Sequence, residues 1–354
     1  MALSSIGIVG TGENAHDHAA ACQVIPGAEL VAICDISADA LARFGDEFGC
    51  PNRYESLDAM LGAHELDVLV ISTWGPHHAP LALQAMDTGR VRALLVEKPM
   101  AMDAAEAAAM VARAQATGTL LVEGFKWRYD PQHLAAFDAL AAGRIGAVRS
   151  VYGAFSAPLA GRMGEGNWRF DPARGGGSLY DTAGYLIHFA RAAMGGDPVA
   201  ALAIAPESSA DGAELSAAII LEFTEGRVAL LQSSYAQAYH QAVTVIGTQG
   251  WMRYTSPFDS RSSRDAEFVA TPPLAARIDI HGNDFDHEVL EFPPCNQFVA
   301  QLEAVLAAAR TGGQVPASGA FAVGSIATLD ALRASIQSGR KKEVGSGATN
   351  VTTS

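Results

Sequence analysis

The stretch Ile6–Ala15, which reads IGIVGTGENA, carries the strongest signal for the fold. Its first part, Ile6–Val9, is a short apolar run typical of a buried strand, and the pattern GxGxxA opens a predicted helix directly after it. Gly10 permits a tight turn, Gly12 lets the backbone approach a pyrophosphate, and Ala15 lets the helix pack closely on the strand. Because a helix N-terminus attracts anions, we expect the phosphates of a dinucleotide at this turn.

The next predicted strand, Glu29–Cys34, ends in Asp35. An acidic residue at this spacing is expected to bind the ribose hydroxyls of the dinucleotide. Its carboxylate would repel a 2′-phosphate, and the following Ile36 and Ser37 supply no arginine to offset that, so NAD(H) is favoured and NADP(H) stays possible. Alternatively, Asp35 caps the helix that starts near Ala38, a role that Ser37 can also fill.

Strands alternate with helices through the first 124 residues. Further helices are expected at Ser56–Ala63, Ala79–Thr88 and Ala104–Thr117, and further strands at Asp67–Ser72, Arg92–Val96 and Thr119–Phe125. This alternation predicts an α/β fold with a doubly wound, largely parallel sheet, and residues 1–124 as a Rossmann dinucleotide-binding domain.

Glu97, Lys98 and Pro99 follow one of these strands at its carboxyl end, where open α/β sheets bind their ligands. Pro99 ends the strand, keeps Lys98 out of the helical region and can take a cis bond. A lysine fixed there can hydrogen-bond a substrate oxygen or lower the pKa of a neighbour. Taken alone, Glu-Lys-Pro fits a solvated lysine after a strand better, and only the rest of the chain favours a functional lysine.

The loop 73–78, TWGPHH, follows another strand end and should also line the cofactor crevice. Its histidines can instead be polar residues at a helix start. The predicted cofactor-binding residues are Gly10, Gly12, Glu13, Asn14, Ala15, Asp35, Thr73, Trp74, His78, Glu97 and Lys98.

From residue 125 onward the strands become longer. They are expected at Val148–Ala157, Val199–Ala205, Leu215–Phe223, Arg227–Tyr235 and Ala242–Ile246, with closing helices at Gln297–Arg310 and Ala317–Ser338. Thr224, Glu225 and Gly226 form a turn typical of an antiparallel hairpin. Residues 125–344 are therefore predicted to form an α+β domain that binds substrate and mediates oligomerisation, and 345–354 a disordered tail.

Three glycines, Gly175–Gly177, precede a predicted helix in the second half. They allow a close backbone approach to a ligand or to another element. Asp181, Tyr185 and His188 follow at i, i+4 and i+7 and should share one polar stripe, beside an apolar stripe that packs on the core. By spacing alone, a tyrosine on such a stripe is more often a packing residue than a catalytic one.

The stretch 256–288 is polar and is expected to be an irregular loop. His281, Asp284, Asp286 and His287 are metal-ligand types, but their spacing follows no helical or finger pattern, so we expect no metal site. The net charge of −14 argues against binding to nucleic acid or to an anionic membrane, because both need clustered Lys and Arg. Four scattered cysteines, no long apolar run and no signal peptide indicate a cytoplasmic protein.

Together these motifs resemble the glucose–fructose oxidoreductase / inositol dehydrogenase / rhizopine-catabolism (Gfo/Idh/MocA) family over essentially the whole chain. The GxGxxA turn with His18, the Glu97-Lys98-Pro99 motif and the Gly175–Tyr185 stretch match that family in order. The resemblance implies a Rossmann domain followed by a domain with an open, mostly antiparallel sheet. Because a sheet with helices on one side only must cover its other face or leave it wet, we also expect a homo-oligomer, a dimer or tetramer, through that sheet.

By matching position, the resemblance implies that Lys98 is the catalytic lysine, Tyr185 the proton donor or acceptor, and Asp181 a catalytic neighbour that binds substrate. The expected substrate-binding residues are Lys98, Arg128, Trp168, Arg169, Asp181, Tyr185 and His188. Tyrosine at 185 is similar to the branch containing dihydrodiol and xylose dehydrogenases, whereas the 73–76 loop is similar to loops of some inositol dehydrogenases. Ala183 and His188 depart from the commoner glycine and aspartate, which leaves the substrate open.

The expected reaction moves a hydride between nicotinamide C4 and a secondary alcohol or ketone of a sugar, inositol or related cyclic polyol. Tyr185 would exchange the proton, and its pKa of about 10 must fall to be useful near neutrality. Lys98 would favour the phenolate and polarise the substrate oxygen. Two alternatives stay open: an NAD-dependent glycosidase that oxidises its substrate transiently, and a non-catalytic dinucleotide sensor, which would need none of Lys98, Asp181 and Tyr185.

Overall fold

The computed structural model describes residues 3–164, 166–258, 276–284 and 286–345, which divide into two compact units. The first unit contains residues 3–129 and 295–322, and the second contains 130–258, 276–294 and 323–345. The chain therefore returns to its first unit near the C-terminal end. The functional division into 1–124 and 125–344 stays a prediction.

The first unit contains a parallel sheet. Its strands are β1 Ser4–Val9, β2 Ala28–Cys34, β3 Arg53–Tyr54, β4 Leu66–Ile71, β5 Val91–Val96 and β6 Leu120–Glu123. In the described residues their order is β3-β2-β1-β4-β5-β6, and every pair is parallel. The central strands are buried on both faces toward their carboxyl ends, which explains why β4 is apolar from Val68 to Ile71 and β5 from Ala93 to Val96.

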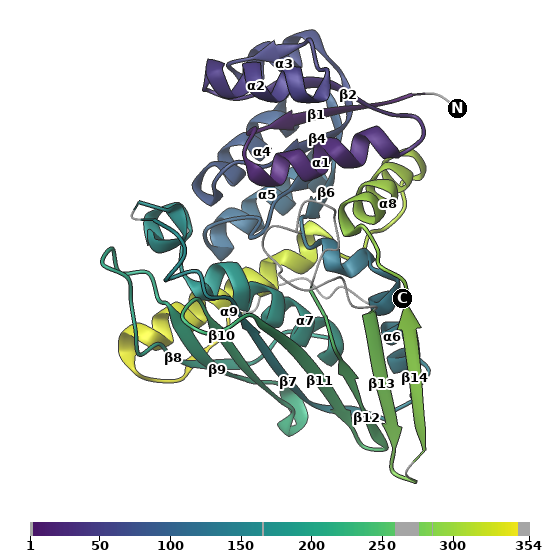
Figure 1. The fold of residues 1–354 in the computed structure, drawn as a ribbon, viewed down its shortest axis with the longest axis vertical. Helices are drawn as coiled ribbons and strands as arrows, with labels where there is room; N and C mark the ends of the chain where they lie inside the picture. Colours follow the sequence, from purple (N-terminus) through teal and green to yellow (C-terminus); the bar gives the residue numbers. More distant parts are fainter. Residues whose placement is uncertain (1–2, 165, 259–275, 285, 346–354) are drawn as a thin grey trace. The chain divides into compact units, whose positions relative to one another are not determined.

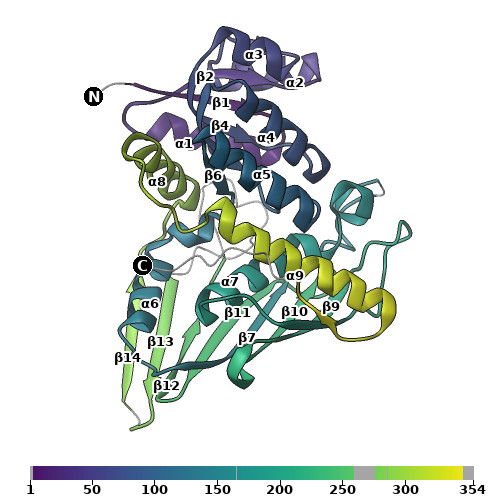
Figure 2. The ribbon, with the colours of Figure 1, turned by 180° about the vertical axis from the view of Figure 1, so that it is seen from behind.

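Helices cover both faces of this sheet, as Figures 1 and 2 show from opposite sides. They are α1 Glu13–Val24, α2 Ala38–Phe48, α3 Leu57–Ala63, α4 His78–Asp87, α5 Ala104–Thr117 and α8 Gln297–Thr311. Helix α8 packs on α1, while α4 packs on α5. This arrangement confirms the predicted doubly wound sheet.

The second unit contains a larger, mixed sheet. Its strands are β7 Val148–Ser156, β8 Ala200–Ile204, β9 Ser216–Glu222, β10 Val228–Ser234, β11 His240–Gly247, β12 Gly250–Tyr254, β13 Ala276–Gly282, β14 His287–Phe292 and β15 Lys342–Glu343. Within the described ranges the order is β14-β13-β12-β11-β7-β10-β9-β8-β15. Strands β7 and β10 pair in parallel and the other neighbours are antiparallel, so the expected open, mostly antiparallel sheet is confirmed.

The expectation of an irregular loop over 256–288 is wrong for its last part, where β13 and β14 form a hairpin. Strand β14 alternates between exposed and half-buried residues, as an edge strand does. Its charged side chains made the segment read as a polar loop in the sequence. Strand β12 was also not predicted. Residues 259–275 of the predicted loop and the predicted tail after residue 345 lie outside the described residues.

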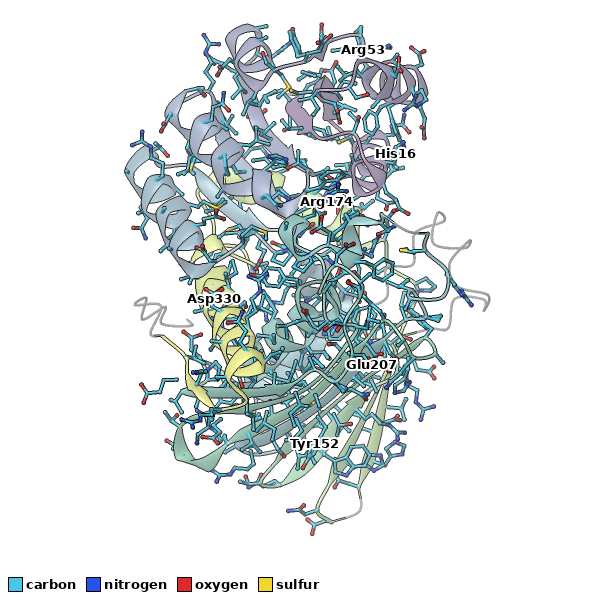
Figure 3. The ribbon with its side chains drawn as sticks, turned by 90° about the vertical axis from the view of Figure 1, so that its left-hand side faces the viewer. His16, Arg53, Tyr152, Arg174, Glu207 and Asp330 are labelled. Atoms are coloured by element: carbon cyan, nitrogen blue, oxygen red, sulfur yellow. The ribbon has the colours of Figure 1, made fainter. Side chains whose placement is uncertain are left out.

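The helices of the second unit lie on one face of its sheet. They are α6 Pro131–Ala141, α7 Gly184–Met194 and most of α9 Gly319–Ser338. No described helix covers the opposite face, on which Figure 3 shows Tyr152. Across the described part of the chain, no helix is long and apolar enough to cross a membrane. A cytoplasmic location stays a prediction.

Candidate active site

The glycine turn after β1 has the backbone that its sequence predicted. Gly10 has φ of +84°, and a Cβ there would lie 2.7 Å from the carbonyl oxygen of Ser72. Its amide donates to the carbonyl of Cys34 at 2.8 Å, which ties the turn to the end of β2. Gly10 is therefore required by both its left-handed conformation and its contact with the chain after β4.

The residues after this turn fit a dinucleotide. Gly12 is the N-cap of α1, and a Cβ built there would meet nothing within 4 Å. Glu13 and Asn14 are exposed in the first turn, whereas Ala15 is buried where α1 packs on the sheet. The first amides of α1 thus border open space at the positive end of a helix, as a bound pyrophosphate requires.

Asp35 lies against the glycine turn. Its Oδ2 accepts hydrogen bonds from the amide of Thr11 at 2.8 Å and from the Thr11 hydroxyl at 2.9 Å. Ser37 caps α2 by accepting from the amide of Ala40, so the alternative that Asp35 is this cap is wrong. The carboxylate is therefore held at the carboxyl end of β2, where the predicted ribose contact requires it.

Glu97 is buried under the lysine turn and is hydrogen-bonded to α1. His18 Nε2 lies 2.8 Å from Glu97 Oε1, and the Lys98 amide donates to Glu97 Oε2 at 3.3 Å. Burial alone would raise the pKa of Glu97, but the hydrogen bond from His18 and the charges of His18, Lys98 and Lys126 outweigh it and lower that pKa. Because the ionised carboxylate can only accept, His18 Nε2 carries the proton in this contact.

Neighbouring backbone fixes the path of the lysine turn. A Cβ on Gly124 would lie 3.0 Å from the Glu97 Cα and 3.3 Å from the Lys98 amide nitrogen, so the chain after β6 packs directly on this turn. The Lys98–Pro99 peptide bond is cis. Contacts with β5, β6 and α1 therefore fix the backbone from which the Lys98 side chain projects.

His78 joins the two strand-end loops of the first unit. It is 1% exposed, and its ring nitrogens lie 2.9 Å from the carbonyl oxygens of Pro99 and Thr73. Burial lowers its pKa below the ordinary value of 6.5, although both carbonyls and Glu97 oppose that shift. The neutral ring donates to one carbonyl at a time and holds the two loops together. Trp74, on the same loop as Thr73, is half exposed.

In the second unit, the glycine run packs against another element. A Cβ on Gly176 would lie 2.5 Å from the Trp168 carbonyl oxygen, and one on Gly177, with φ of +105°, would clash with the Glu214 carboxylate. Glu214 Oε1 accepts from the amide of Leu179 at 3.0 Å. Burial raises the pKa of Glu214, and the Leu179 amide and the Arg333 charge offset only part of this.

Asp181 is held by two side chains of the second unit, one 12 positions before it and one 54 positions after it. Its Oδ2 accepts from Arg169 Nε at 3.3 Å and from the Tyr235 hydroxyl at 2.9 Å. The guanidinium of Arg169 lies 4.7 Å from the ring of Trp168. The structure therefore brings three predicted substrate-binding residues, Trp168, Arg169 and Asp181, into one cluster.

Tyr185 and His188 are buried, so the expectation of a polar stripe is wrong. Tyr185 is 9% exposed and lies against Phe155 and Phe258, with ring centroids 5.5 and 5.4 Å away, and His188 is 0% exposed. The reason is the π-helical turn Leu179–Ala183 ahead of α7, which breaks α-helical spacing, together with burial of nearly every residue of α7.

Arg128, the remaining predicted substrate-binding residue, packs inside the first unit. Its guanidinium lies 5.4 Å from the Trp127 ring and 5.7 Å from the Phe321 ring, and Nη2 donates to the Pro316 carbonyl at 3.4 Å. No group of three or more His, Cys, Asp or Glu in the described ranges could hold a metal ion. Sequence reasoning missed Tyr235 and Glu214, because nothing in their local sequence marks them.

The parallel sheet with its glycine turn defines a dinucleotide-binding domain. The description "Oxidoreductase family, NAD-binding Rossmann fold" matches residues 4–125, and "GFO/IDH/MocA C-terminal domain" matches residues 133–253. The chain belongs to the GFO/IDH/MocA family of oxidoreductases, which confirms the resemblance seen in the sequence.

Two relatives and one solved structure show what the chain is similar to. A dTDP-3,4-didehydro-2,6-dideoxy-alpha-D-glucose 3-reductase from Streptomyces antibioticus is 30% identical over 289 residues, or 81% of this chain and 82% of that protein. A D-apiose dehydrogenase from Paraburkholderia graminis is 29% identical, over 96% of this chain and 89% of that one. A 3-ketoreductase from Actinomadura kijaniata, crystallised with NADP and TDP-benzene, has a TM-score of 0.81 over 94% of this chain and 98% of that one. Because the two sequences are only 24% identical, this similarity shows the fold alone.

Proposed function

We propose that this chain interconverts a secondary alcohol and a ketone on a sugar, inositol or related cyclic polyol. The observation that carries the proposal lies in the first unit. Lys98 follows β5 at the same sheet edge where the dinucleotide turn follows β1, and the His18–Glu97 hydrogen bond joins these two segments. A cation held beside a cofactor cradle is suited to a substrate oxygen that gains or loses charge.

The roles of the side chains follow from their chemistry. NAD(P), when bound, supplies the nicotinamide C4 that accepts or donates the hydride. Lys98 hydrogen-bonds the reacting oxygen, Tyr185 takes the alcohol proton in oxidation and returns it in reduction, and the Asp181 carboxylate binds a substrate hydroxyl. Support for Asp181 comes from its fixed geometry against Arg169 and Tyr235, and support for the other two comes from the family motifs that they match.

The cofactor is proposed to be NAD(H) in preference to NADP(H). Asp35 is held over the glycine turn, where its negative charge disfavours a 2′-phosphate. Ile36, the next residue, is 92% exposed and cannot pair with such a phosphate.

A homo-oligomer is proposed to form through the open face of the second unit's sheet. Tyr152, Ile204, Ile220 and Leu230 expose large apolar side chains on this face, around a groove of about 470 Å³. An apolar surface of this kind on a sheet covered by helices on one side only favours burial against a second copy.

The proposed function is tested by following absorbance of the reduced nicotinamide with a panel of aldoses, inositols and keto-sugars, each with NAD(H) and with NADP(H). We expect steady cofactor turnover with at least one of them. Cleavage of glycosides without net reduced cofactor would instead support the glycosidase alternative. Dinucleotide binding without turnover of any member would support the sensor.

A further inference from the structure

Tyr235 contacts the carboxylate that the proposed function assigns to substrate binding. Its hydroxyl lies 2.9 Å from Asp181 Oδ2 and 3.2 Å from the Gly177 carbonyl oxygen. Arg169 Nε reaches the same Oδ2 at 3.3 Å. Two donors from different segments therefore converge on one oxygen of Asp181, which restricts rotation of the carboxylate.

The Tyr235 side chain is itself rigidly held. It is 0% exposed, and its ring stands edge-on to Phe170 at 6.1 Å. Its amide donates to the Leu215 carbonyl at 2.7 Å, and its carbonyl accepts from the Ala160 amide at 3.0 Å. Because the Tyr235 hydroxyl is rigidly held, its hydrogen bond restricts the position of the Asp181 carboxylate.

The Tyr235 hydroxyl donates across the whole working pH range. Burial, and then the negative charge of Asp181, raise its pKa well above 10. Because it is fully buried, it cannot reach a substrate and so cannot replace Tyr185 as the group that exchanges the proton. Any effect on the reaction must therefore pass through Asp181, whose side chain keeps 12% of its surface exposed.

We infer that Tyr235 is a positioning residue, whose hydroxyl orients the Asp181 carboxylate toward a substrate hydroxyl. This inference rests on the proposed function, because that function gives Asp181 a hydroxyl to bind. A donor to the ionised carboxylate also favours its charged form, so the inference has a pH signature as well as an affinity signature.

The test compares Tyr235→Phe with Tyr254→Phe, a control that removes another buried tyrosine hydroxyl from the same unit. For Tyr235→Phe we expect the KM for the active polyol to rise roughly tenfold, kcat to change less than threefold and NAD affinity to stay unchanged. The acid limb of kcat/KM against pH should move up by about one unit. In an Asp181→Asn background, the same substitution should have no further effect.

Tyr254→Phe should match the wild type in KM and in its pH profile. A Tyr235→Phe variant that behaves like this control, while Tyr185→Phe is disabled, overturns the inference and leaves the proposed function standing. Wild-type protein that turns over no panel member overturns both. Should Tyr235→Phe fail to fold, 3-fluorotyrosine at position 235 supplies a stronger donor, so the acid limb should move down, and an unmoved limb would overturn the inference.

Discussion

His18 and Glu97 are 79 positions apart in the sequence, yet their side chains form a buried hydrogen bond of 2.8 Å. This contact ties helix α1, which begins at the dinucleotide turn, to the residue before Lys98. The start of α1, where a cofactor would bind, and Lys98, where a substrate oxygen would bind, are therefore fixed relative to each other.

Glu97→Gln should destabilise the first unit in a pH-dependent way. The folded-state pKa of Glu97 lies below its ordinary value of 4.5, so the stability it contributes is present above that value and is lost as the pH falls through the folded pKa. We expect the variant to lose about 1–3 kcal/mol at pH 7. Thermal unfolding midpoints from pH 3 to 7 check this, and a gap between the two proteins that stays constant below pH 4.5 would contradict it.

Lys98 and Tyr185 are predicted to act as one catalytic unit. Tyr185→Phe should lower turnover by roughly 10²–10⁴ with NAD binding nearly intact, and Lys98→Ala should do similar damage. The double variant should be little worse than either alone, because residues that act together are not additive. Lys98→Arg should not restore the lost turnover, since a guanidinium neither matches the reach of the ammonium group nor releases its proton. Turnover of this set on the active polyol is decisive, and near-normal activity in Tyr185→Phe would mean that another group carries the proton.

Asp35 is predicted to set the cofactor preference. Titration of the wild type should show at least tenfold tighter binding of NAD(H) than of NADP(H), about 1.4 kcal/mol. Asp35→Ser removes the charge that is proposed to face the 2′ position, so it should narrow the ratio of the two affinities, mainly by improving binding of NADP(H). Tighter binding of NADP(H) to the wild type would sink the idea.

The open sheet face is predicted to bury itself in an oligomer. Light scattering at micromolar concentration should give a mass of at least twice 36.9 kDa. Leu230→Asp places a charge on the exposed apolar face and should dissociate the assembly, whereas Leu3→Asp, at a more exposed apolar site in the first unit (66% against 40%), should not. A monomeric wild-type mass would count decisively against this surface.

The cysteines should differ strongly in reactivity. Burial raises the pKa of Cys22 to about 12 and that of Cys34 to about 11, and it also raises that of Cys50. Since the thiolate is the reactive form, all three should resist alkylation at pH 8 in the folded protein. Cys295 is half-buried and should be modified first. Peptide mapping after a short iodoacetamide pulse checks the order, and early modification of Cys22 would contradict it.

The sequence by itself determined the parallel sheet of the first unit and the helices that follow its strands, but not that residues 295–322 belong to the same unit. Its information is local: an apolar run, a glycine turn and a small residue at Ala15 specify strand, turn and helix within a few positions. The same holds for Lys98, because a strand end followed by proline already says where the lysine stands on the sheet. Even the residue that caps α2, Ser37 and not Asp35, was one of two local candidates.

Only the tertiary structure decided which side chains surround Asp181. Tyr235 lies 54 positions away from it, and Glu214, which packs on Gly177 ahead of Asp181, comes 37 positions after that glycine and just before β9. Such pairs depend on the order and register of a mixed sheet, which no local pattern specifies, and on the π-turn that displaces Asp181 from its α-helical position. The edge hairpin β13–β14 was not predicted for the same reason. Its polar residues adopt strand structure because they pair with neighbouring strands, not because of their own sequence pattern.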